Sequence, residues 1–130
     1  MNNEKLIKIA NKMREKAYAP FSKYTVGASV EVEGGKIIGG CNVESASYGL
    51  TTCAERVALY NAISKGYTSF NAIAVASKNG GFPCGACRQV IWELCENIPV
   101  IIIDNENGIT KTSSKELLPN AFSKSKLENC

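Results

Sequence analysis

Residues 53–104 read CAERVALYNAISKGYTSFNAIAVASKNGGFPCGACRQVIWELCENIPVIIID, and this stretch decides the fold. Its first part, residues 53–65, places apolar residues at helical spacing and predicts a helix. The apolar run at 71–77 predicts a short strand, Pro83 predicts the start of another helix, and residues 100–104 predict a buried strand. Helix and strand therefore alternate, which is typical of parallel strands covered by helices.

The sequence before this stretch predicts one helix and one hairpin. Residues 4–18 carry apolar side chains on one face and lysine and glutamate on the other, so we expect an amphipathic helix that ends at Ala19–Pro20. Residues 26–32 and 36–41 are expected to form two strands that pair through a turn at 33–35.

The sequence after residue 104 predicts smaller elements. Gly108 indicates a turn, residues 110–112 an edge strand, and residues 113–118 a short capped helix, while the polar tail from residue 123 is expected to be irregular. Together the elements predict a three-layer α/β/α sandwich with a mixed sheet of about five strands. We expect a single domain over residues 1–130.

The composition argues against several classes of function. The chain has 130 residues, of which 45% are hydrophobic and 21% charged, and its net charge of +3 does not indicate nucleic-acid binding. The N-terminal residues MNNEKLIKIANK contain no apolar signal-peptide core. The longest apolar run, residues 72–76, is too short to cross a bilayer. We therefore expect a cytoplasmic protein with neither membrane nor nucleic-acid partners.

Two residue counts limit the chemistry further. The sequence has no histidine, which excludes every mechanism with a histidine base and every metal site with a histidine ligand. It has six cysteines, at positions 41, 53, 84, 87, 95 and 130. In a reducing compartment these are expected to be thiols, metal ligands or small buried apolar residues rather than disulfides.

The most informative motif is Cys84-Gly85-Ala86-Cys87. Two cysteines three residues apart on the first turn of a helix face the same way and can hold one ion. The positive end of the helix dipole also favours the thiolate form of both side chains. By itself, this motif fits a redox pair, half of a zinc site, or chance.

A third cysteine favours the zinc site. Cys53 opens the helix that precedes this motif, and Glu55 follows two residues later. If parallel strands bring the two helix N-termini together, Cys53, Cys84 and Cys87 provide three thiolates. Three protein ligands with an open fourth position are typical of a catalytic zinc.

Two further cysteines are candidates for a fourth ligand. Cys95 lies roughly 12 Å along the helix axis from Cys87, which argues against it. Cys41 ends a strand, and its spacing alone does not exclude it. Arg56, beside the ligand helix, is a candidate to hydrogen-bond a thiolate and offset the negative charge of the site, and Arg88 is a weaker one. The alternative for either arginine is an ordinary solvated side chain.

These residues match the signature of zinc-dependent nucleoside and base deaminases, [HC]-A-E followed by P-C-x-x-C. The likeness extends over YAPFSKYTVGA (18–28), GCNVESASYGLTTCAERVAL (40–59), PCGACRQVIWEL (83–94) and LLPNAF (117–122). The chain resembles the small cytidine deaminases that bind zinc through three cysteines and are typically homotetrameric. The resemblance covers nearly the whole sequence, in order.

The resemblance implies a role for each matching residue. Cys53, Cys84 and Cys87 match the ligands of one Zn²⁺ per subunit, Glu55 matches the proton shuttle, and Arg56 lies beside the ligands. The residues that match substrate-binding positions are Tyr24, Asn42, Glu44, Ala54 and Phe122.

Four of these positions have a plainer interpretation. Asn42 and Glu44 match residues that hold the ribose hydroxyls, but outside the family pattern they would be turn and surface residues. Tyr24 matches a ring that packs against the pyrimidine, where the family usually has phenylalanine, and it could instead be a core residue. Phe122 matches an aromatic that approaches a neighbouring subunit's site, or it is a surface anchor.

The implied reaction is zinc-dependent hydrolytic deamination of cytidine and 2′-deoxycytidine to the uridine nucleosides, with release of ammonia, in pyrimidine salvage. One alternative is a blasticidin S-type deaminase with the same zinc chemistry. Another is a non-enzymatic zinc module in which Cys41 closes a four-thiolate site. A thioredoxin-like redox module is disfavoured because it would leave Cys53 and Glu55 without a purpose.

Overall fold

A five-stranded mixed sheet forms the centre of the computed structural model, which describes residues 3–128. The strands lie in the order β2-β1-β3-β4-β5. Their bounds are β1 Gly27–Val32, β2 Ile37–Cys41, β3 Phe70–Ser77, β4 Pro99–Asp104 and β5 Gly108–Ser113. Strand β3 is parallel to β4, and the other neighbouring pairs are antiparallel. The sheet therefore has the mixed character that the sequence predicts.

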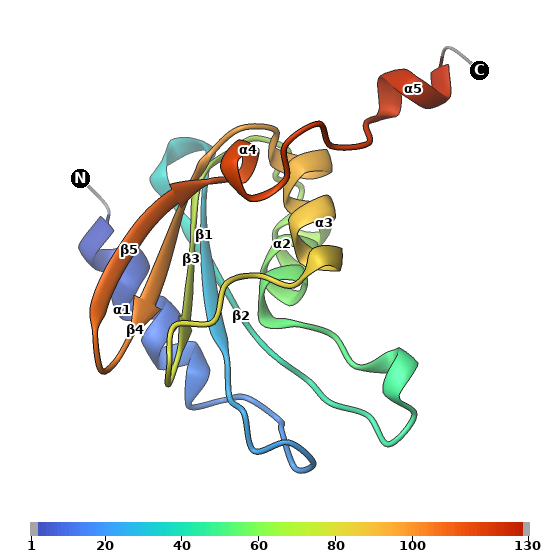
Figure 1. Cartoon of the computed structure of the whole chain (residues 1–130). Helices are drawn as coiled ribbons and strands as arrows, with labels where there is room; N and C mark the ends of the chain where they lie inside the picture. The colour runs from blue at the N-terminus through green and yellow to red at the C-terminus, as the bar shows by residue number, and fades with distance from the viewer. Residues whose placement is uncertain (1–2, 129–130) are drawn as a thin grey trace.

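Helices cover both faces of this sheet (Figure 1). Helix α1 (Asn3–Arg14) packs on one face, and α2 (Ala54–Ser64) and α3 (Gly85–Cys95) pack on the other. The shorter elements are η1 Glu33–Gly35, η2 Tyr48–Leu50, α4 Ser114–Leu117 and α5 Lys124–Glu128. None of the helices within residues 3–128 is long and apolar enough to span a bilayer.

Alternating side chains on the buried strands fill two separate apolar cores. On β3, Ile73 and Val75 join the core beneath α2 and α3, whereas Ala74 and Ala76 join the core beneath α1. A strand that is buried on both faces reads as a continuous apolar run, as residues 72–76 do. These two cores confirm the predicted three-layer sandwich.

Glycine lets the helix that carries Cys53 lie directly on the sheet. A Cβ atom at Gly40 would lie 2.3 Å from the backbone nitrogen of Ala58 in α2. Any larger residue would push the helix away from β2, because no real Cβ contact is that short. The position of α2 relative to the sheet therefore depends on this residue.

Two predictions differ most from the structure. Helix α1 ends at Arg14 rather than Tyr18, because Tyr18 pairs with the extended chain at Val43. Its backbone nitrogen donates to the carbonyl of Asn42 (3.0 Å), and its carbonyl accepts from the nitrogen of Glu44 (2.8 Å). The tail from residue 123, expected to be irregular, contains the five-residue helix α5.

Candidate active site

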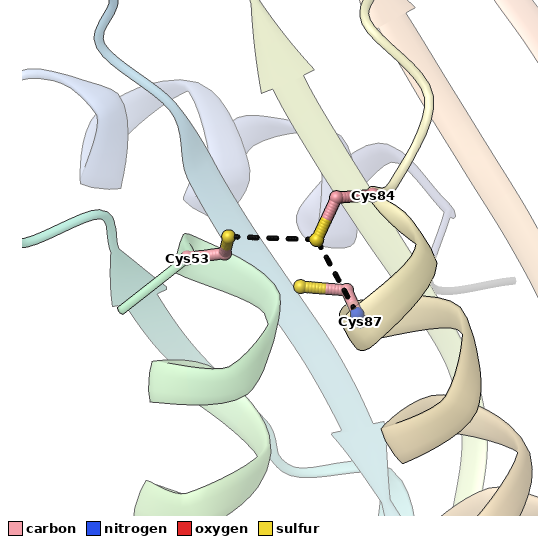
Figure 2. Close-up of side chains that lie close together, drawn as sticks. All are labelled: Cys53, Cys84 and Cys87. Atoms are coloured by element: carbon pink, nitrogen blue, oxygen red, sulfur yellow. Dashed lines mark hydrogen bonds between the residues drawn. The ribbon is translucent and has the colours of Figure 1, made fainter. Parts of the chain in front are cut away.

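The N-termini of α2 and α3 bring three cysteines together (Figure 2). Cys53 is the N-cap of α2, Cys84 is the N-cap of α3, and Cys87 lies in the first turn of α3. Their sulfur atoms all lie within 4.8 Å of one another. The Cys84 sulfur accepts a hydrogen bond from the backbone nitrogen of Cys87 (3.4 Å), so it also caps the helix.

The parallel strands explain why these helix ends meet. Helix α2 leads into β3, and α3 connects β3 to the parallel strand β4. Helices that alternate with parallel strands run antiparallel to them, so both N-termini lie at the carboxyl edge of β3. The structure thus brings together the three sulfurs that the sequence predicts as one group.

The sulfur geometry fits a tetrahedral zinc ion. With Zn–S bonds of about 2.3 Å, two sulfur ligands of one tetrahedral zinc lie roughly 3.8 Å apart. The Sγ atoms of Cys53 and Cys84 are 3.8 Å apart. Three sulfurs without a histidine or carboxylate among them form a soft donor set, which suits zinc.

The acidity of these thiols fits the same interpretation. A hydrogen bond from the Cys87 thiol, together with bonds from Arg56 and Cys84, lowers the pKa of Cys53 to about 5. The bond that Cys87 gives to Cys53, and then its burial, raise the pKa of Cys87 above its ordinary value. One thiolate therefore forms readily in this group, and a bound cation favours the thiolate form of its ligands.

No fourth cysteine of residues 3–128 joins this group. The Cys41 thiol donates to the carbonyl of Lys16 (3.5 Å) instead. Cys95 lies at the other end of α3, where burial raises its pKa to about 12. Cys130 lies outside the described residues. The described cysteines thus leave the fourth position of a tetrahedral ion open, and Cys41 does not close the site.

Glu55 lies beside these sulfurs in the first turn of α2. Only 4% of its surface is exposed, and it lines the same pocket as Cys53 and Cys84. Burial raises the pKa of its carboxyl group to about 7, so the group can both accept and release a proton near neutral pH. A buried carboxyl group next to a metal site is suited to proton transfer.

The guanidinium of Arg56 donates to a cysteine sulfur, whereas that of Arg88 donates to backbone carbonyls. Nη2 of Arg56 donates to the Cys53 sulfur over 3.4 Å, and its buried Nε has no partner within residues 3–128. Arg88 instead donates from Nε to the carbonyl of Pro83 (2.7 Å) and from Nη1 to the carbonyl of Leu117 (3.1 Å). The expectation that Arg88 offsets thiolate charge is therefore wrong, because backbone carbonyls hold its guanidinium.

A pocket opens between the cysteine group and two loops, residues 15–26 between α1 and β1 and residues 78–84 between β3 and α3. Of the predicted site residues, it is lined by Tyr24, Asn42, Glu44, Cys53, Ala54, Glu55 and Cys84. The other lining residues were not predicted from the sequence, and they are Ser22, Val26, Thr51, Val75, Ser77, Gly81 and Phe82. Ser77 could have been found, because it is the polar residue at the carboxyl end of a parallel strand, where ligands bind in such sheets.

Hydrogen bonds to the loop of residues 15–26 orient Asn42 and Glu44. The Asn42 side chain accepts from the backbone nitrogen of Val26 (2.9 Å) and donates to the carbonyl of Tyr24 (2.8 Å). Oε1 of Glu44 accepts from the backbone nitrogens of Phe21 (2.9 Å) and Ser22 (3.1 Å). The Ser22 hydroxyl also donates to Oε2, and this bond contributes most to lowering the pKa of Glu44. Both polar side chains are thus held at the pocket wall.

The two predicted aromatic residues lie in different places. Tyr24 lines the pocket, and its hydroxyl donates to Oδ1 of Asn79 over 2.7 Å. Phe122 is 54% exposed and does not line the pocket of its own chain. Its carbonyl accepts from the Gln89 side chain (2.8 Å), which attaches the C-terminal segment to α3. A role of Phe122 at a neighbouring subunit stays a prediction.

Comparison with known proteins identifies the family. The family model of the cytidine and deoxycytidylate deaminase zinc-binding region matches residues 1–103. The chain belongs to this family. Its zinc-binding region, together with the three-cysteine group, makes zinc the metal of this site.

Individual relatives match over nearly the whole chain. A cytidine deaminase from Sporosarcina psychrophila is 48% identical over 130 residues, which cover 98% of this chain and 96% of the relative. One from Halalkalibacterium halodurans is 47% identical over 125 residues, which cover 94% and 95%. The crystal structure of a cytidine deaminase from Burkholderia pseudomallei superposes with a TM-score of 0.90 at 46% identity, over 94% of this chain and 100% of that one. A blasticidin-S deaminase from Bacillus cereus is more distant, at 29% identity over 75% of this chain and 76% of the relative.

Proposed function

We propose that this protein is a zinc-dependent cytidine deaminase, which hydrolyses cytidine and 2′-deoxycytidine to uridine and 2′-deoxyuridine with release of ammonia. The observation that carries the proposal is a three-sulfur site with an open position, next to a buried carboxyl group, in one pocket. Relatives up to 48% identical over nearly the full chain are cytidine deaminases, which supports the same substrate here.

The residues that would hold the ion are Cys53, Cys84 and Cys87. A zinc ion in this position supplies a Lewis acid, which lowers the pKa of a water molecule from roughly 15.7 to about 7. Arg56, at 3.4 Å from the Cys53 sulfur, places a positive charge beside a ligand set that otherwise carries three negative charges. Its contribution is to keep that charge from weakening the Lewis acid.

Glu55 moves the protons of the reaction. Its carboxylate takes a proton from the attacking water and delivers it to N3 of the cytosine ring, which makes C4 more electrophilic. After the water oxygen bonds to C4, Glu55 carries the second proton to the exocyclic amino group, and the C4–N bond breaks. One water is consumed, one ammonia leaves, and the carboxylate returns to its starting state.

Substrate selection would rest on the pocket wall. Asn42 and Glu44 would hydrogen-bond the ribose hydroxyls, the Tyr24 ring would pack against the pyrimidine, and Ala54 would contact the base through its backbone. A free base leaves the polar groups at the sugar position without partners, so cytosine should react poorly. The 2′-hydroxyl is not essential in this scheme, so 2′-deoxycytidine is also a substrate.

The assembly and cellular role follow the family resemblance. We expect a homotetramer in the cytoplasm that serves pyrimidine salvage, in which Phe122 approaches the site of a neighbouring subunit. Exposed apolar side chains such as Tyr48 (81%) and Leu50 (71%) support association between subunits. Sedimentation equilibrium measures the subunit number, and a monomer would contradict this part.

The first experiment follows the ultraviolet absorbance of cytidine with purified, zinc-loaded protein, with the product identified by chromatography. Conversion to uridine is the expected result. A protein that binds one zinc and converts blasticidin S but not cytidine would instead favour the blasticidin-type alternative. A protein that binds one zinc and converts neither compound would contradict the deaminase proposal.

A further inference from the structure

The pocket is bordered by two loops that are far apart in the sequence. Residues 15–26 join α1 to β1, and residues 78–84 join β3 to α3. Tyr24 from the first loop lines the pocket together with Gly81 and Phe82 from the second. Whatever joins these loops therefore sets the width of this side of the pocket.

One side-chain hydrogen bond connects them. The Tyr24 hydroxyl donates to Oδ1 of Asn79 over 2.7 Å, across 55 positions of sequence. This distance is the commonest one for O–H···O hydrogen bonds, so the contact is well formed without a displacement of either loop.

Each loop is separately fixed, so the bond joins two ordered segments. Tyr24 donates from its backbone nitrogen to the Ser22 hydroxyl (3.0 Å), and Ser22 in turn donates to the Glu44 carboxylate. In the second loop, the backbone nitrogen of Gly81 donates to the hydroxyl of Ser77 (3.0 Å), which is 1% exposed. Neither segment has to be ordered at the moment the substrate binds.

The second loop also fits closely around the hydroxyl group. A Cβ atom at Gly81 would lie 2.6 Å from the Tyr24 hydroxyl oxygen but 3.7 Å from the ring carbon that carries it. The hydroxyl, and not the ring, is therefore the group that a Cβ atom at this position would displace. The neighbouring Gly80 has a φ of +67°, and a Cβ atom there would lie 2.8 Å from the Cβ atom of Asp104, so this position also favours glycine.

We propose that Tyr24 is a positioning residue whose hydroxyl fastens residues 79–82 to the opposite loop and thereby fixes the rim of the substrate pocket before the nucleoside enters. The inference rests on the proposed deaminase function. Fixing the rim in advance lowers the entropy cost of binding, so the hydroxyl acts on substrate affinity. It does not reach the cysteines or Glu55, so it leaves the chemical step unchanged.

The direct test is Tyr24→Phe, which removes the hydroxyl and keeps the ring. We expect KM for cytidine to rise by about three- to tenfold, the effect of one exposed hydrogen bond, with kcat within twofold of wild type. Amide hydrogen exchange in the peptide that contains residues 78–82 should become faster. Tyr60→Phe, on the exposed side of α2, is the control for the loss of a tyrosine hydroxyl.

Two further substitutions separate the hydrogen bond from general effects on the loop. Asn79→Ala should reproduce the rise in KM. Asn79→Asp should keep KM at the wild-type value, because a carboxylate also accepts from the hydroxyl. Gly81→Ala should displace the hydroxyl and raise KM in the wild-type background. In the Tyr24→Phe background it should add nothing, because the atom that it would strike is missing. Gly49→Ala, where a Cβ atom meets nothing within 4 Å, is the glycine control.

Two results would overturn the inference. One is a Tyr24→Phe protein with unchanged KM and unchanged hydrogen exchange, and the other is a Gly81→Ala substitution that is equally harmful with Phe at position 24. Failure of the proposed function is distinguishable, because then the wild-type protein itself would not deaminate cytidine. The hydrogen-exchange comparison still tests the fastening of the loops in that case.

Discussion

The metal-binding half of the pocket and its substrate-facing half are built in different ways. The three sulfurs are placed by the first turns of α2 and α3, which lie on the sheet through a continuous apolar core. The residues proposed to contact the nucleoside lie on loops, apart from Ala54, and are oriented by hydrogen bonds such as those that Asn42 accepts from Val26 and Glu44 accepts from Phe21. Helix termini fix the position of the chemistry, and the loops determine what reaches it.

The two halves of the pocket also differ in the free energy needed to open them locally. Helix termini packed on a core move only when the core is disrupted, whereas a loop held by a few exposed hydrogen bonds opens at a much lower free energy. Substitutions in the first region should therefore change metal content or kcat. Substitutions in the second should change KM and specificity. The following predictions test that division.

The largest effect expected in a protein that keeps its zinc is that of Glu55→Gln. The amide keeps the shape of the side chain but cannot carry a proton, so kcat for cytidine should fall by about 10²–10⁴-fold. Zinc content, measured by atomic absorption, should stay at one per chain. Near-normal turnover would remove Glu55 from the proposed mechanism.

Next is Cys53→Ala, which removes one of the three sulfurs. Two protein ligands hold zinc too weakly for a stable site, so both bound zinc and activity should be lost. Cys95→Ala, at the far end of the adjacent helix, is the matched control and should keep both. Full zinc content in the Cys53→Ala protein would show that Cys53 is not a zinc ligand.

A smaller effect is expected for Arg56→Gln. Loss of the charge beside the Cys53 sulfur should reduce kcat by about 10- to 100-fold, typical of residues that support metal ligands. Zinc should remain bound, and KM should change less than kcat. Arg88→Gln is the informative comparison, because that guanidinium binds carbonyls rather than sulfur. If Arg88→Gln lowers kcat as much as Arg56→Gln, charge beside the thiolate is not the cause.

The smallest effect is expected for Glu44→Gln, in the substrate-facing half of the pocket. Its amide can accept fewer hydrogen bonds from residues 21–22 and from a sugar hydroxyl, so KM should rise by about tenfold with kcat little changed. Glu33→Gln is the matched control, because Glu33 also accepts from loop nitrogens, those of Thr68 and Ser69, outside the pocket. A drop in kcat without a rise in KM would contradict the division between the two halves.

The metal-binding half could be predicted from the sequence in most of its detail. The alternation of helix and strand over residues 53–104 implies parallel strands, and parallel strands place the two helix N-termini at one edge. Because Cys53 and Cys84 lie at those N-termini, their meeting could be expected on the condition that the strands are parallel, and the family resemblance implied the same ligand set. Glu55 is buried because the first turn of α2 lies against the sheet.

The substrate-facing half could be predicted only where it matched a family pattern. The contacts of Tyr24 with Asn79, and of Gly81 with Ser77, join residues whose separation depends on how two irregular segments fold back. The hydropathy of these two loops has neither a helical nor a strand period, so no pattern in the sequence predicts these contacts. The same limitation explains Arg88, whose partners are backbone carbonyls, and the early end of α1, which is set by pairing of Tyr18 with Val43.

The strand order has a consequence for how the protein is made. Strand β1 lies between β2 and β3, so β1 becomes an inner strand of the sheet only after residues 70–77 have been synthesised. The last sulfur, that of Cys87, follows ten residues after β3 ends at Ser77. Chains grow from the N-terminus at roughly 5–20 residues per second, so the nascent chain carries Asn42 and Glu44 well before it can capture an ion. The third sulfur therefore becomes available only after β1, β2 and β3 have been synthesised and before β4 has been.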